Sequence, residues 1–79
     1  MKKKIVLNDF VTIKRFASEV VSFKSNITLT SFDGEFRVDA KSLMALYVLD
    51  LEKVLSVEIF SDDEQEIKDF NEAMKQFEA

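Results

Sequence analysis

The only glycine of the chain, Gly34, follows Asp33 between two segments in which apolar and polar residues alternate. Alternation with a period of two is typical of a strand with one buried face. An Asp-Gly pair tolerates positive φ at both central positions of a tight turn. We therefore predict an antiparallel hairpin of residues 26–31 and 35–39, with both turn residues at positive φ. Its buried side chains are expected to be Ile27, Leu29, Phe36 and Val38.

Two more strands and three helices are predicted from the same kind of pattern. Residues 3–7 and 54–60 alternate like strands. Apolar residues recur every three or four positions from Phe10 to Val20, and Asn8 or Asp9 is placed to cap that helix. Ser42 precedes a short apolar run over 43–49. A capping box is expected at Ser61 and Glu64, before a helix whose apolar stripe is Ile67, Phe70, Met74 and Phe77.

The predicted order of elements is β-α-β-β-α-β-α, within one domain of residues 1–79. The chain has no proline and a single glycine, so no linker is apparent. Four strands with one apolar face each are best covered by helices on that face only. We therefore expect an α+β fold, an open-faced sandwich with a four-stranded antiparallel sheet whose second face is wet.

The chain contains neither cysteine nor histidine, which excludes several kinds of site. Disulfides are impossible, and zinc, haem and iron–sulfur centres lose their usual ligands. Serine hydroxyls lack the usual activating base, and acidic pairs such as Asp62 with Asp63 lie where a helix start favours them. We expect no catalytic residue, metal or cofactor, and a core stabilised by apolar packing alone.

The net charge of −4 argues against a nucleic-acid partner. The charge is uneven, because residues 1–24 carry six basic and two acidic side chains, whereas residues 58–79 carry two basic and eight acidic ones. These ends are either solvated faces or docking surfaces for protein partners. No segment is long and apolar enough to enter a membrane, so we expect a cytoplasmic protein.

The order of elements resembles that of the HPr phosphocarriers of the phosphotransferase system, which take part in sugar uptake. Residues 40–44, Ala-Lys-Ser-Leu-Met, resemble the regulatory-serine motif of that family. Residues 23–30 resemble the approach to its second strand, and residues 62–65 resemble the start of its last helix. The likeness extends over roughly residues 16–78 and rests on the ordered combination of these segments.

The chain departs from this family at the active centre. In the family a histidine at the start of the first helix takes up phosphate, followed closely by an arginine and a proline. Counting back from Phe23 without gaps places Asp9 at the histidine, Val11 at the arginine and Thr12 at the proline. An aspartyl phosphate is known chemistry, but no carboxylate cluster for magnesium is evident near Asp9, and a helix cap is the simpler role.

The resemblance makes Ser42 a candidate for regulatory phosphorylation, as in relatives that lack the histidine (the Crh type). A phosphate there would lie at a helix N-terminus, whose N–H groups favour negative charge. Lys41 lies next to it, and Leu43, Met44 and Tyr47 are candidate partner-binding residues around it. The simpler alternative is that Ser42 caps a helix and its apolar neighbours belong to the core.

Three functions remain open at this point. The first is a regulatory HPr-like protein whose Ser42 is modified by a serine kinase and read by a transcription factor or a phosphotransferase component. The second is a protein–protein interaction module that is never phosphorylated. The third is a phosphocarrier with an unconventional acceptor, which fold alone would not establish.

Overall fold

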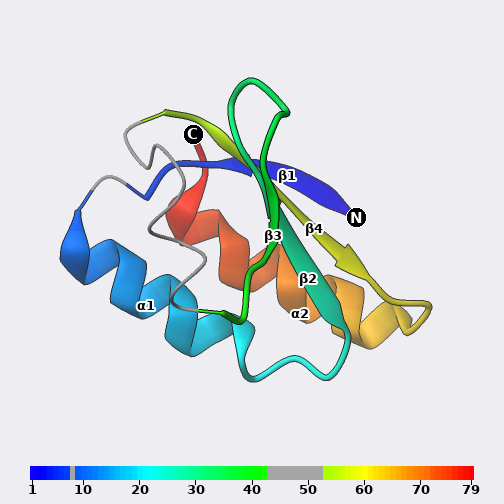
Figure 1. Cartoon of the computed structure of the whole chain (residues 1–79). Coiled ribbons are helices and arrows are strands. Elements are labelled where there is room, and N and C mark those ends of the chain that lie inside the picture. The colour runs from blue at the N-terminus through cyan, green and yellow to red at the C-terminus, as the bar shows by residue number, and fades with distance from the viewer. Residues whose placement is uncertain (8, 43–52) are drawn as a thin grey trace.

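The strands form one antiparallel sheet with the order β1-β4-β2-β3 (Figure 1). The computed structural model describes residues 1–7, 9–42 and 53–79. Its elements are β1 (Lys2–Ile5), α1 (Phe10–Val20), β2 (Asn26–Thr30), β3 (Arg37–Asp39), β4 (Leu55–Phe60), α2 (Glu64–Met74) and the 3-10 turn η2 (Lys75–Phe77). This confirms the predicted α+β class and the four-stranded antiparallel sheet. The helix expected over 43–49 lies outside the described residues.

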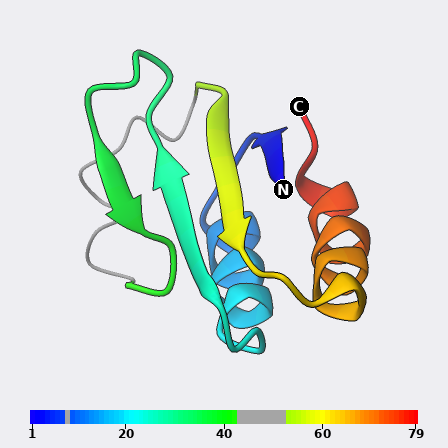
Figure 2. The same ribbon diagram turned by 90° about the vertical axis from the view of Figure 1, so that its right-hand side faces the viewer.

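The core lies between the sheet and the layer formed by α1 and α2 (Figure 2). The two central strands, β2 and β4, contribute alternate residues to it: Leu55, Val57 and Ile59 of β4 are all buried while the residues between them are not. Two edge-to-face aromatic pairs join the elements: Phe16 of α1 with Phe77 of η2, and Phe23 with Phe70 of α2. Most of the expected apolar stripe of each helix therefore meets in one core. Ile67 of the predicted α2 stripe is only half-buried and does not belong to this core.

The predicted helix face was wrong at one position. Phe10, at the first residue of α1, is 61% exposed. Its ring lies 5.4 Å from the Lys14 ammonium, one turn along the helix. The core begins only further along the helix, where Phe16 and Val20 are fully buried.

The loop between β2 and β3 projects beyond the end of the sheet and differs from the predicted turn (Figure 1). Gly34 has φ +79°, but Asp33 does not take positive φ. The Asp33 carboxylate accepts hydrogen bonds from the Ser31 hydroxyl (2.7 Å) and the Glu35 N–H (3.0 Å), and the Ser31 hydroxyl accepts from the Phe36 N–H (3.0 Å). These bonds extend the loop, so β3 begins only at Arg37, and Phe36 is 50% exposed instead of buried.

Replacing Gly34 by alanine is expected to lower the free energy of unfolding by roughly 1–2 kcal/mol, the cost of holding an L-residue in the left-handed region. No atom lies within 4 Å of the added Cβ, so the backbone conformation alone is responsible. Urea unfolding measures the loss. Gly34→Asn should lose less, because asparagine tolerates this conformation better; an asparagine variant as unstable as the alanine variant would contradict the explanation.

Candidate functional site

Ser42 is exposed and directly follows a short turn at the end of β3. The Ser42 N–H donates to the Asp39 carbonyl oxygen (3.1 Å), and the Lys41 N–H donates to the Asp39 carboxylate (2.9 Å). Ala40 anchors this turn, because its side chain is buried and its N–H donates to the Ile27 carbonyl (2.9 Å). The end of a sheet strand thus holds the Ser42 backbone while leaving the residue open to solvent.

The Lys41 side chain is half-buried and binds the backbone of another segment. Its ammonium donates to the Phe23 carbonyl oxygen, which ties the turn before Ser42 to the segment after α1. Lys41 also borders a hollow of about 340 Å³ along α1, together with Lys14, Ala17, Ser18 and Val21. The other predicted partner-binding residues, Leu43, Met44 and Tyr47, lie outside the described residues.

Asp9 caps α1, as expected from the sequence. Its carboxylate accepts a hydrogen bond from the Thr12 N–H (2.7 Å), and its carbonyl accepts one from the Ile13 N–H (3.0 Å). The bonds from Thr12 lower the pKa of Asp9, with a smaller contribution from the charge of Arg15. A carboxylate stabilised in this way is a weaker nucleophile, because one oxygen accepts the Thr12 N–H bond and the lowered pKa makes the group less basic.

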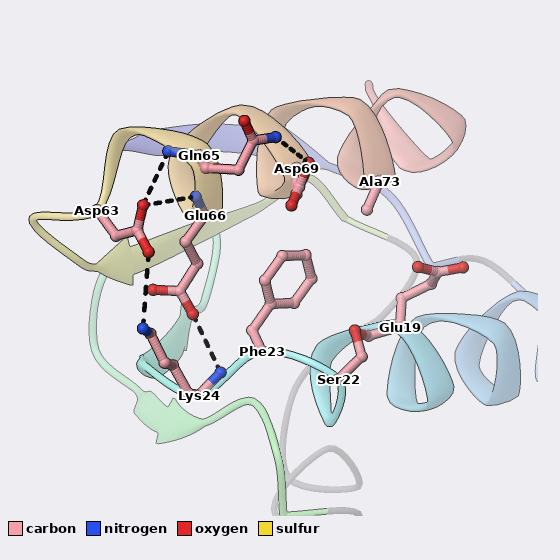
Figure 3. Close-up of a pocket in the computed structure, with 9 residues that line it drawn as sticks. All are labelled: Glu19, Ser22, Phe23, Lys24, Asp63, Gln65, Glu66, Asp69 and Ala73. Carbon is pink, nitrogen blue, oxygen red and sulfur yellow. Dashed lines mark hydrogen bonds and ion pairs between the residues drawn. The ribbon is translucent and has the colours of Figure 1, made fainter.

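Glu66 is a buried carboxylate with several hydrogen-bond donors around it, and the sequence analysis did not single it out. It lies in the first turn of α2, is only 8% exposed, and borders a hollow of about 440 Å³ between the end of α1 and α2 (Figure 3). Its carboxylate accepts hydrogen bonds from the Ser25 and Ser61 hydroxyls and from the Lys24 and Ser25 N–H groups. These bonds, those of the Ser25 and Ser61 hydroxyls first, lower its pKa to about 2.

The Glu66 bonds are structural, because they tie the segment before β2 to the segment after β4. The predicted capping box at Ser61 and Glu64 was wrong: Asp63 is the N-cap, and its carboxylate accepts from the Gln65 and Glu66 N–H groups. Asp63 and Glu66 have the same three-residue spacing as a capping box. That pattern was therefore present in the sequence two residues further along, and only tertiary contacts show that Glu66 turns inward.

The described part of the chain contains neither a candidate metal site nor a membrane-spanning helix. No group of three or more acidic residues within it is placed to hold a metal ion. Neither of its helices has the length and apolar character to cross a bilayer. Ser42 and the α1 N-terminus at Asp9 are therefore the two candidate sites within the described residues.

Residues 12–79 match the model of the family described as PTS HPr component phosphorylation site. The matched range begins at Thr12 and so leaves out Asp9. No curated protein sequence matches the chain.

Two solved structures are similar in fold. One is HPr-C-His from Thermoanaerobacter tengcongensis, with a TM-score of 0.72, 19% sequence identity, and coverage of 96% of this chain and 92% of that one. The other is the histidine-containing phosphocarrier protein of Mycoplasma, with a TM-score of 0.66, 21% identity, and coverage of 96% and 93%.

Proposed function

Because the chain belongs to the HPr family of the phosphotransferase system, we propose that it is a regulatory member of that family in which Ser42 is the phosphoacceptor. The observation that carries the proposal is the combination of an exposed Ser42 in a backbone-anchored turn with a sequence that contains no histidine. A phosphohistidine cannot form in such a sequence. The proposal includes a cytoplasmic location, where a serine kinase and the other phosphotransferase proteins would meet it.

The chemistry proposed for Ser42 is a transfer from ATP catalysed by a kinase. The Ser42 hydroxyl oxygen forms a bond to the γ-phosphorus, the bond between that phosphorus and the β–γ bridging oxygen breaks, and ADP leaves. The hydroxyl proton passes to a base of the kinase, since no histidine is available in this sequence. The product carries roughly −1.5 to −2 added charge at that position, which is enough to alter a protein contact.

Asp9 is a poor alternative acceptor on the same grounds. Its carboxylate is bound to the Thr12 N–H at the start of α1, and its pKa is lowered. A phosphoryl group on the other carboxylate oxygen would weaken that cap, because the remaining carbonyl oxygen no longer carries the carboxylate charge. We therefore propose that histidine-type transfer from phosphoenolpyruvate is absent and that the chain acts by binding proteins, among them a transcription factor or a phosphotransferase component.

Intact-mass spectrometry of the purified protein tests this proposal. We expect one added phosphoryl group after incubation with ATP and the HPr serine kinase, and none with phosphoenolpyruvate and the upstream phosphotransferase enzyme. Ser42→Ala should abolish the addition, whereas Ser18→Ala, which removes an exposed serine on α1, should retain it.

The other outcomes decide between the alternatives. If neither incubation adds a phosphoryl group, the chain is a non-phosphorylated interaction module on this fold. A phosphoryl group acquired from phosphoenolpyruvate and lost in Asp9→Asn would instead establish an unconventional phosphocarrier.

A further inference from the structure

A row of four side chains crosses the sheet on the face opposite the helices. Strand register places Lys4 of β1 opposite Ser56 of β4, Ser56 opposite Thr30 of β2, and Thr30 opposite Arg37 of β3. We name these four residues the cationic row. It has one positive charge at each end and two hydroxyls between them.

The cationic row lies on the exposed face because strand residues alternate between the two faces. Its members are exposed or half-exposed, whereas their chain neighbours Ile5, Leu55, Val57 and Leu29 are buried. The Arg37 guanidinium lies 5.5 Å from the ring centroid of Phe60, which is 47% exposed. α1 and α2 pack on the other side of the sheet (Figure 2).

The two cations of the row have no acidic partner within residues 1–7, 9–42 and 53–79. No described carboxylate forms an ion pair with Lys4 or Arg37: the ion pairs within residues 1–7, 9–42 and 53–79 join other residues. The next row along the sheet contains Lys2, Glu58, Thr28 and Asp39, so there one cation faces two carboxylates and the positive charge is confined to the cationic row. A chain with a net charge of −4 thus has a positive strip on its exposed sheet face.

From this arrangement we propose that the cationic row is a docking surface for an acidic, extended segment of a partner protein. The Cα positions of Lys4 and Arg37 are three strand spacings apart, roughly 14 Å, so an extended ligand is needed to reach both ends of the row. An extended chain rises about 3.3 Å per residue, so two carboxylates roughly four residues apart match both ends. The Ser56 and Thr30 hydroxyls would donate to groups between them, and Phe60 would offer apolar contact beside Arg37.

The test is an amide chemical-shift titration of the ¹⁵N-labelled protein with a short extended peptide of glycine and serine that carries two glutamates roughly four residues apart. We expect shifts centred on Lys4, Thr30, Arg37 and Ser56, which weaken as salt screens the charges. The same peptide with glutamine in place of glutamate should cause none. Lys4→Gln combined with Arg37→Gln should weaken binding roughly tenfold, the sum of two exposed ion pairs.

Two further variants distinguish binding at the cationic row from an effect of the overall charge of the protein. Lys14→Gln combined with Arg15→Gln removes the same charge from α1 and should leave the affinity within about twofold. Glu58→Gln removes a negative charge next to Ser56 along β4 and should strengthen binding.

Several results would overturn the proposal. They are shifts centred on α1, equal binding by the glutamine peptide, no loss in the double variant of the row, or no shift at roughly millimolar peptide. Equal shifts with an oligothymidylate would also overturn it, because the surface would then recognise any polyanion.

Discussion

Replacing Phe70 by alanine should lower the free energy of unfolding by roughly 3–5 kcal/mol, a quarter or more of the total stability of the domain. The side chain is fully buried on α2 and packs edge-to-face against Phe23, with ring centroids 5.8 Å apart. Removing a buried phenylalanine costs roughly 3–5 kcal/mol from lost burial and the cavity that remains. A 79-residue domain has only roughly 4–12 kcal/mol of stability in total.

The absence of cysteine makes this loss hard to offset, because no disulfide restrains the unfolded chain. Urea unfolding followed by circular dichroism measures the change. Phe32→Ala is the matched control, since Phe32 is 66% exposed in the β2–β3 loop, and it should change the stability by at most about 0.5 kcal/mol. Similar losses in both variants would mean that α2 does not pack on the core as described.

The second large effect is expected from Glu66. Its folded-state pKa is about 2, against an ordinary value of 4.5, because the Ser25 and Ser61 hydroxyls bind the ionised form. A lowered carboxyl pKa stabilises the folded state fully above the unfolded-state value and loses that contribution as the pH falls toward the folded-state value. Thermal stability should therefore decline between about pH 4.5 and about pH 2 partly through this one group.

Glu66→Gln should remove this contribution at neutral pH and flatten the decline below pH 4.5. The amide has one oxygen to accept bonds, so its NH₂ replaces one of the two oxygens that accept hydrogen bonds in Glu66. We expect the melting temperature at pH 7 to fall by roughly 10 °C. Glu64→Gln makes the same charge change at an exposed position of α2 and should leave the decline of the melting temperature at acid pH unchanged. If the decline at acid pH were the same in Glu66→Gln as in the original protein, Glu66 would not be the group responsible.

Local patterns predicted most of the described elements. Alternation located all four strands, each with an error of one or two residues at an end, and the spacing of apolar residues located α1 and α2. The Asp9 cap was also predicted, because a cap bonds to N–H groups within the next few residues. The errors at Asp33 and Ser61 arose where several serine and aspartate side chains compete for the same backbone donors.

The sequence by itself determined the fold class and the lack of histidine chemistry, because each follows from composition or from residues close together in the chain, and its resemblance to the HPr family made Ser42 a candidate. Only the tertiary structure decided what depends on residues far apart. Strand register brought Lys4 and Arg37 into one row, and folding brought Ser25 and Ser61 to the same carboxylate of Glu66. Such contacts follow from how the buried faces pack together, which no local period encodes.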